Sequence, residues 1–353
     1  MNLLKKFNVP LLILPVLIFS LGYITLLSTS GERAKDQLMF FAAGYVLYIL
    51  VSFVDIHIFK HYWKSIYYVV LALLFMTLLI GEVRYGSARW FDLGFFTIQP
   101  SEFAKIALVL SLSAVIVSDI GILHNFKKFV QILMIVLPVL VVVFLQPDLG
   151  TTLVLLGATA VLLFFAGLNR IYFIISLLVF GTFSRPIWEL LKDYQKERIL
   201  VFFNPGLDVL GSGYNVIQAL IAVGSGGLMG KGFGRGTQAQ HDFLPVNWTD
   251  FIFASFAEEW GFIGVLIMMT LFSLLLLSLL FVSYRAKDSY GSLVAVGVFT
   301  IFFVQIIINV GMNLGVMPVT GIPLPLVSYG GSSLLTSMIL LGIVQSVWTG
   351  NKT

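Results

Sequence analysis

The stretch that decides the fold runs from His241 to Phe253 and reads HDFLPVNWTDFIF. It ends a long polar segment and places the carboxylate of Asp250 where a long apolar run begins. Glu258 and Glu259 lie further inside the same run. An ionised carboxylate at the edge of a hydrocarbon layer is costly unless something compensates its charge. Asp250 is therefore the best candidate for a chemical role.

Composition fixes the class of protein. Of the 353 residues, 59% are hydrophobic and 11% charged, and the mean hydropathy is +1.00. A soluble domain could not bury so much apolar surface, so the chain is a polytopic membrane protein. Apolar runs of about 20 residues can cross a core of roughly 30 Å, and they predict an all-α fold of about ten transmembrane helices. The expected spans are 10–28, 37–56, 65–81, 100–119, 129–146, 149–167, 171–190, 250–282, 292–312 and 331–349.

Basic residues in the short loops set the orientation, because they collect on the cytoplasmic side. One set of segments carries Lys5, Lys6, Lys60, Lys64, Lys127, Lys128, Arg170, Arg285, Lys287 and Lys352, whereas the other short loops carry only Arg33, Lys35, Arg84 and Arg89. Both termini are therefore expected in the cytoplasm. The loop of about 191–249, between the seventh and eighth spans, faces outward with Asp250 at its end. Residues 1–353 form one integral membrane domain.

Several classes of site and partner are excluded. The basic N-terminal run resembles a signal peptide, but its apolar part is too long, and an uncleaved first span is expected. The absence of cysteine removes disulfides, cysteine nucleophiles and thiolate metal sites. A net charge of +4 reflects inner-face lysines that meet anionic lipid, so no nucleic-acid partner is expected.

The outer loop is rich in glycine, as in GSGG at 224–227 and GKGFGRG at 230–236. A phosphate-binding P-loop would need glycine in place of Ser225 and a hydroxyl residue in place of Gly232, and no strand precedes the segment. The glycines are instead expected to let the loop fold tightly over the membrane. Residues 215–223 have the pattern of a short amphipathic helix at the interface.

Two similar motifs open the fourth and sixth spans, QPSE at 99–102 and QPDLGT at 146–151. In each, proline suits the first helical position and a polar side chain can cap free amides. The N-termini of the fourth, sixth and eighth spans then all point outward, where their positive dipole ends favour an anion such as a diphosphate. The alternative is that these are ordinary helix starts.

Charged residues near these starts are candidate site residues. Glu102 and Lys105 share one helix face, and they either neutralise each other or line an outward cavity with Asp250. Arg89 precedes the fourth span and could hold a phosphate by two hydrogen bonds. Its alternative is a lipid headgroup anchor beside Trp90.

The acids of the eighth span have different expected roles. Glu258 and Glu259 cannot contact Asp250 on the same helix, and we expect them in interhelical hydrogen bonds or at a cavity floor, protonated or paired. Asp250 also has an alternative role that is purely structural. At a helix start, the Thr249 hydroxyl can cap the helix and the Asp250 charge can stabilise the helix dipole.

Taken together, these motifs resemble the SEDS family (shape, elongation, division and sporulation), and most closely its RodA branch. The resemblance covers nearly the whole chain and rests on GSARW at 86–90, QPSEFAK at 99–105, QPDLGT at 146–151, TDFIF at 249–253 with Glu258-Glu259, and NLGVMPVTGIPLPLVSYGGSS at 313–333.

The resemblance implies a bacterial inner-membrane peptidoglycan glycosyltransferase that polymerises lipid II. Its implied partners are a class B penicillin-binding protein, which crosslinks the strands, and the elongation machinery. The family's essential acid falls on Asp250. Glu102 and Lys105 match polar positions in the family's cavity, and Asp148 and Ser328 match motif positions, so all four are expected to bind substrate.

The chemistry agrees with these residues. Asp250 at the water–lipid boundary can act as general base on the acceptor hydroxyl, with a pKa raised by desolvation. Lys105, Arg89, helix N-termini and loop cations can stabilise the leaving diphosphate, and so can a divalent cation, Mg²⁺ or Mn²⁺, held with a carboxylate that the sequence does not identify. No organic cofactor is expected. Direct attack on an α-linked donor inverts it to a β-linkage, and the lipid tail is expected in a groove between spans.

Some alternatives remain open. The proline-rich segment 318–325 suits either a cavity wall or a re-entrant turn packed on the ninth span. Exposed apolar faces on the eighth and ninth spans meet either lipid or a single-span partner. A lipid II flippase would need similar spans and charges, and a scaffold for cell-wall enzymes would need no catalytic acid.

Overall fold

The computed structural model describes residues 7–84, 87–92, 94, 97–118, 126–204, 208, 211–241 and 243–350. Seven of the described helices are long and apolar enough to cross a membrane. They are α1 (Val9–Thr29), α2 (Gly31–Ser52), α3 (Ile56–Ile80), α4 (Pro100–Val117), α12 (Ile252–Arg285), α13 (Ser289–Asn313) and α14 (Gly331–Gly350). Among them α2 packs on α14, α12 packs on α1 and α13, and α3 packs on α4. The chain is therefore a helical, multi-pass membrane protein, as predicted.

The other three predicted spans are also helical, but two of them are short. α5 (Phe126–Leu145) has 20 residues, α6 (Leu149–Phe165) has 17 and α7 (Arg170–Thr182) has 13. The predicted seventh span is interrupted at Phe183, after which α8 (Ser184–Leu190) begins. The total of ten spans stays a prediction.

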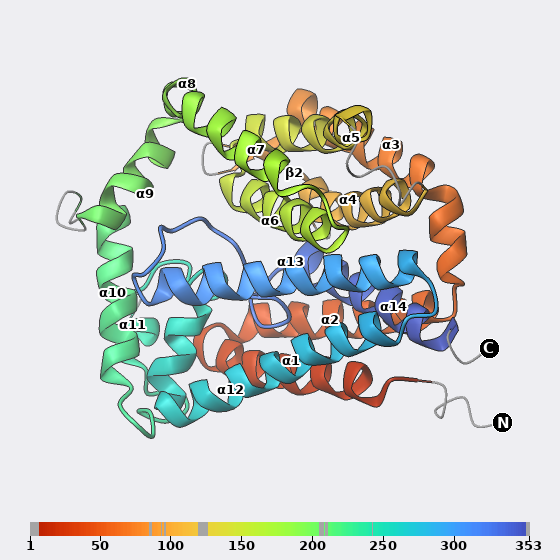
Figure 1. The fold of residues 1–353 in the computed structure, drawn as a ribbon. Coiled ribbons are helices and arrows are strands. Elements are labelled where there is room, and N and C mark those ends of the chain that lie inside the picture. The colour runs from red at the N-terminus through yellow and green to blue at the C-terminus, as the bar shows by residue number, and fades with distance from the viewer. Residues whose placement is uncertain are drawn as a thin grey trace.

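The outer loop contains more helix than expected. It includes α9 (Asp193–Phe203), α10 (Ser212–Ser225) and α11 (Thr237–Gln240), and α10 contains the helix predicted at 215–223. Figure 1 shows α9, α10 and α11 at one end of the bundle, and the start of α1 and the end of α14 near the opposite end. This arrangement agrees with two termini on one side and the loop on the other. Which side is cytoplasmic stays a prediction, and Lys5, Lys6 and Lys352 lie outside the described residues.

The all-α prediction is wrong at one place, the connection between α3 and α4. There β1 (Glu82–Arg84), β2 (Ser87–Asp92) and β3 (Thr97–Ile98) form an antiparallel sheet in the order β1-β2-β3. In its register Phe91 pairs with Ile98 and Asp92 with Thr97. Strands of two to six residues are too short to give a clear alternating pattern in the sequence. The sheet places Arg89 beside the start of α4.

α12 is broken at Gly261, whose φ is 64° and ψ −166°. A positive φ is accessible to glycine at little cost. The glycine-rich loop supplies the hydrogen-bond acceptors that the helix lacks at this break. The amides of Phe262 and Ile263 donate to the carbonyls of Gly227 and Leu228 at 2.9 and 3.1 Å. The predicted span 250–282 is therefore two helical segments, and both glutamates lie in the first, beneath the loop.

Candidate active site

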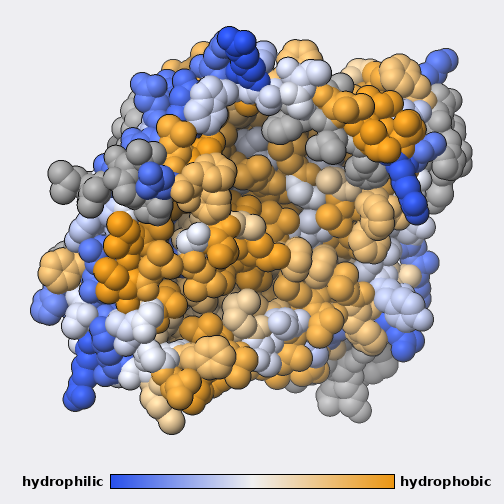
Figure 2. All heavy atoms as spheres, turned by 60° about the vertical axis from the view of Figure 1, so that its left-hand side comes forward, coloured by the Kyte–Doolittle hydropathy of each residue, from blue (hydrophilic) through white to orange (hydrophobic). Residues whose placement is uncertain are grey.

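A groove of about 430 Å³ opens between α5, α6, α8, α9 and the segment 318–320. Most of its wall is apolar, and its polar members gather toward α9 and β2. Figure 2 shows that hydrophobic side chains cover the middle of the face turned forward, while hydrophilic ones collect along its edges. The lining residues are Arg89, Leu140, Val141, Phe144, Pro147, Leu149, Thr152, Leu153, Leu156, Ile187, Leu191, Tyr194, Gln195, Arg198, Ile199, Pro318, Val319 and Thr320.

α9 contributes three polar side chains to this groove. Tyr194 and Arg198 are four residues apart and share a helix face, with the guanidinium 5.7 Å from the tyrosine ring centre. Arg198 Nη1 donates to the carbonyl of Val319 at 3.4 Å. The Tyr194 hydroxyl and Gln195 Nε2 each donate to the carbonyl of Pro147 at 3.1 Å. α9 is thereby tied to the start of α6.

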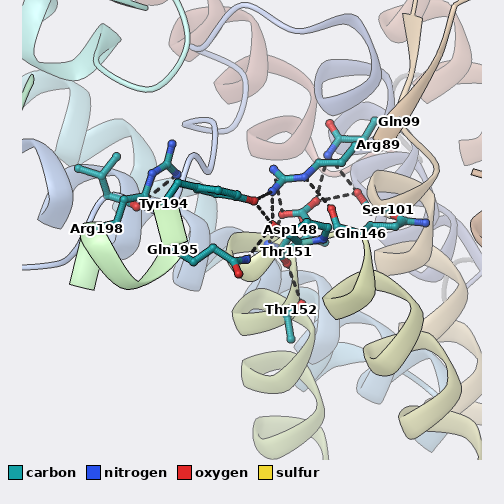
Figure 3. A network of polar contacts seen from close by, with 12 residues as sticks. Arg89, Gln99, Ser101, Gln146, Asp148, Thr151, Thr152, Tyr194, Gln195 and Arg198 are labelled. Atoms are coloured by element: carbon teal, nitrogen blue, oxygen red, sulfur yellow. Dashed lines mark hydrogen bonds and ion pairs between the residues drawn. The ribbon is translucent and has the colours of Figure 1, made fainter. Parts of the chain in front are cut away.

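Arg89 lies at the centre of the polar network in Figure 3. Its Nε donates to the carbonyl of Gln146 at 3.0 Å, and Nη2 donates to the carbonyl of Pro147 and to the Tyr194 hydroxyl. Nη1 lies 3.9 Å from Asp148 Oδ1. Arg89 therefore orders the turn before α6 while it lines the groove, and its predicted phosphate contact remains a prediction.

Asp148 joins the starts of α4 and α6. Its Oδ1 accepts the amide of Thr151 at 3.1 Å and caps α6, as the sequence predicted. Its Oδ2 accepts from Ser101 Oγ at 3.0 Å and from Gln99 Nε2 at 3.2 Å (Figure 3). The side chain is buried. These contacts give Asp148 a positioning role, and its predicted substrate contact stays untested.

Glu102 and Lys105 form a buried ion pair on α4, with Lys105 Nζ 2.8 Å from Glu102 Oε2. Each neutralises the other, which matches the first of the two alternatives. Neither residue is among those that line the groove. The predicted outward cavity shared by this pair and Asp250 is therefore not the groove that the structure describes, and their substrate contacts stay predictions.

Asp250 sits in a tight turn just before α12. The turn is made by Val246, whose φ is 56°, and the amides of Thr249 and Phe251 both point to the Val246 carbonyl, at 3.2 and 3.5 Å. A β-carbon at Gly321 would lie 3.6 Å from both Arg198 Nη1 and Asp250 Oδ2. The acid and the guanidinium thus lie on either side of Gly321, next to Thr320 of the groove wall. Arg198 lines the groove, whereas Asp250 lies beside it and is not among the lining residues.

The surroundings of Asp250 act on its pKa in opposite directions. Burial raises the pKa of this carboxyl, while the positive charge of Arg198, a hydrogen bond from the Thr249 hydroxyl and the charge of Arg89 each act to lower it. Burial prevails, so the pKa lies above that of an ordinary aspartate. A base with a raised pKa is suited to take a proton near neutral pH.

Ser328 fixes the proline-rich segment to the turn that carries Asp250. Its Oγ donates to the carbonyl of Thr249 at 2.6 Å and accepts the amide of Leu324 at 2.8 Å. The amide of Tyr329 donates to the carbonyl of Trp248 at 2.9 Å. Ser328 is buried, so these contacts position Asp250, and its predicted substrate contact stays untested. The segment 318–325 lines the groove and also packs on α13. Its predicted contact with sugar or phosphate and its re-entrant course stay predictions.

Glu258 is paired with a lysine and Glu259 is hydrogen-bonded to another helix, which are two of the predicted roles, and both acids hold the glycine-rich loop. Glu258 Oε1 lies 2.6 Å from Lys231 Nζ and accepts the amide of Thr237 at 2.8 Å. Glu259 Oε1 accepts from Ser28 Oγ at 2.5 Å. The two acids are therefore structural.

The residues that the structure describes contain no group of three or more histidine, cysteine or acidic side chains able to hold a metal ion. The carboxylates nearest the groove each have an arginine close by, Asp250 with Arg198 and Asp148 with Arg89. These residues do not fit a preformed divalent-cation site, and the predicted cation remains a prediction.

The family model for the FtsW/RodA/SpoVE cell cycle proteins matches residues 3–353. This chain belongs to the FtsW/RodA/SpoVE family.

Relatives of the family agree over nearly the full length. The peptidoglycan glycosyltransferase MrdB of Escherichia coli K12 is 37% identical over 349 residues, which are 97% of this chain and 93% of MrdB. A chain from a peptidoglycan synthase complex that coordinates polymerization and crosslinking is 33% identical, with 98% of each chain covered and a TM-score of 0.84. The rod shape determining protein RodA of Thermus thermophilus is 29% identical, with 98% of each chain covered and a TM-score of 0.76. The resemblance to the SEDS family and its RodA branch is confirmed.

Within the FtsW/RodA/SpoVE fold, sequence reasoning missed the polar side of α9. Tyr194, Gln195 and Arg198 are not among the predicted site residues. The available signal was the pair Tyr194 and Arg198, spaced for one helix face, after an acidic first-turn residue, Asp193.

Proposed function

We propose that this chain is a peptidoglycan glycosyltransferase that polymerises lipid II into glycan strands for cell elongation, with Asp250 as general base. One observation carries the proposal: a carboxylate of raised pKa lies across Gly321 from Arg198, a guanidinium that lines a largely apolar groove. The relatives' activity as peptidoglycan glycosyltransferases supports it.

The reaction follows from this arrangement. Asp250 takes the proton of the acceptor sugar hydroxyl as that oxygen bonds to the donor's anomeric carbon, and the bond from this carbon to the diphosphate breaks. One direct displacement inverts an α-linked donor to a β-linkage. Arg198 and Arg89, which line the groove, supply positive charge for the departing diphosphate.

The apolar length of the groove suits the lipid tail. Val141, Leu153 and Leu156 line it and are substantially exposed, so this wall faces the surrounding lipid. A tail can therefore enter sideways while its diphosphate reaches the arginines. Substrate burial in a largely apolar cleft with few polar groups is the usual design of a ligand site.

Location and partners complete the proposal. We place the protein in the bacterial inner membrane with ten spans, cytoplasmic termini and an outward active site, because basic residues favour that orientation. A class B penicillin-binding protein is the proposed crosslinking partner, since a related chain belongs to a synthase complex that couples polymerization with crosslinking.

The test is polymerisation of lipid II in detergent by the purified protein with its crosslinking partner. We expect glycan polymer from the wild type and none above background from Asp250→Ala. Asp193→Ala, which removes an exposed carboxylate of the outer loop, is the matched control and should keep wild-type activity. Polymer formation by Asp250→Ala would refute the catalytic assignment. Activity that requires sealed vesicles would instead indicate transport.

A further inference from the structure

The backbone of Asp250 is held by two buried asparagines on α13. Asn313 Nδ2 donates to the carbonyl of Asp250 at 3.0 Å, and Asn313 Oδ1 accepts the amide of Ala254 at 3.1 Å. Asn309 Nδ2 donates to the same carbonyl of Asp250 at 3.2 Å. Neither asparagine side chain is accessible to solvent.

The contacts of Asn313 replace one helical hydrogen bond at the start of α12. In a continuous helix the amide of Ala254 would bond to the carbonyl of Asp250, four residues earlier. The side-chain amide of Asn313 lies between these two groups and bonds to both of them. It satisfies a free amide of the first turn of α12 and lets the chain leave the helix at Asp250.

Asn309 also contacts the proline-rich segment 318–325. Asn309 Nδ2 also donates to the carbonyl of Ile322 at 2.8 Å, and Asn313 Nδ2 donates to the carbonyl of Asn309 at 2.8 Å. Ile322 follows Gly321, across which Asp250 and Arg198 face each other. The two asparagines therefore set the distance between the acid's backbone and the proline-rich wall.

We propose that Asn313, assisted by Asn309, is a positioning residue for the glycosyl transfer. By holding the backbone carbonyl of Asp250, it fixes the direction of the Asp250 side chain. The carboxylate oxygens remain accessible to the acceptor hydroxyl. This inference rests on the proposed catalytic role of Asp250. Misplacing a catalytic group by about 1 Å can cost roughly 100-fold in rate.

The test uses Asn313→Leu, which keeps the size of the side chain but removes its donor and acceptor. We expect the turnover rate at saturating lipid II to fall roughly 100-fold per folded protein, with little change in KM. Gln305→Leu is the matched control, because Gln305 is a buried amide on the same face of α13, one turn before Asn309. It should keep the wild-type rate.

A second variant keeps the outcome decisive should Asn313→Leu fail to fold. Asn309→Ala removes only one donor to Asp250, and we expect a smaller fall in turnover rate, about tenfold. In both variants the loss should fall on the turnover rate and leave KM nearly unchanged. Wild-type turnover by the folded asparagine variants, or a loss that falls on KM instead, overturns the inference. Activity retained by Asp250→Ala overturns the catalytic assignment itself.

Discussion

Arg198 and Asp250 come from different elements, yet their charged groups meet at Gly321. The sequence predicted the acid, because a carboxylate at the start of an apolar run has a physical cost that demands a reason. It could not predict the arginine, because only the folded path of the outer loop brings α9 to that place. The same limit applies to Asn309 and Asn313, whose amides look like ordinary polar interruptions of an apolar helix.

The arginine gives a prediction about pH. A general base works only when deprotonated, and burial raises the pKa of Asp250, so the acidic limb of the pH–rate profile should lie above an ordinary aspartate's pKa. Arg198 opposes that shift. Arg198→Ala should therefore move the acidic limb to still higher pH and slow polymerisation by about 100-fold at neutral pH.

The measurement is the initial polymerisation rate across a pH series at saturating lipid II. Arg235→Ala serves as control, since it removes an exposed arginine of the same outer loop, and both its rate and its profile should match the wild type. An unmoved acidic limb in Arg198→Ala would show that Arg198 does not act on the base.

At the scale of elements, most helices follow from hydropathy and capping. The caps of α6 by Asp148 and of α13 by Asp288 are local signals that a sequence displays. The break in α12 is different, because hydropathy continues across Trp260, Gly261 and Phe262 while the replacement hydrogen bonds come from the distant loop. Hydrogen bonds between segments far apart in the chain leave no periodic pattern in the sequence.

The break predicts the effect of Gly261→Ala on stability. A β-carbon there would lie 2.2 Å from the amide nitrogen of Gly230, at a φ that other residues rarely adopt. We expect the free energy of unfolding to fall by about 1–3 kcal/mol or more. Gly224→Ala is the control: it lies in α10 with open space around it, and should be neutral or stabilising by up to about 1 kcal/mol. Thermal unfolding in detergent compares the two, and equal midpoints would contradict the packing described here.

At the scale of the whole molecule, the orientation can be tested directly because the chain has no cysteine. Arg235→Cys places a thiol on the outer loop, and Ala286→Cys places one between α12 and α13, at the end of the bundle where α1 begins and α14 ends. A maleimide that does not cross membranes should label Arg235→Cys in intact cells and Ala286→Cys only after permeabilisation. The parent chain controls for background, and the reverse pattern would invert the proposed topology.

The groove has a consequence for anyone who handles this protein. Its wall is largely apolar and includes the guanidinium groups of Arg89 and Arg198, so it suits a ligand that joins an anionic head group to an alkyl chain. Anionic surfactants with long alkyl chains have this character and should compete for the groove, more strongly as the chain lengthens. Neutral maltoside surfactants lack the head-group charge, and they are the better choice for extraction before any rate is measured.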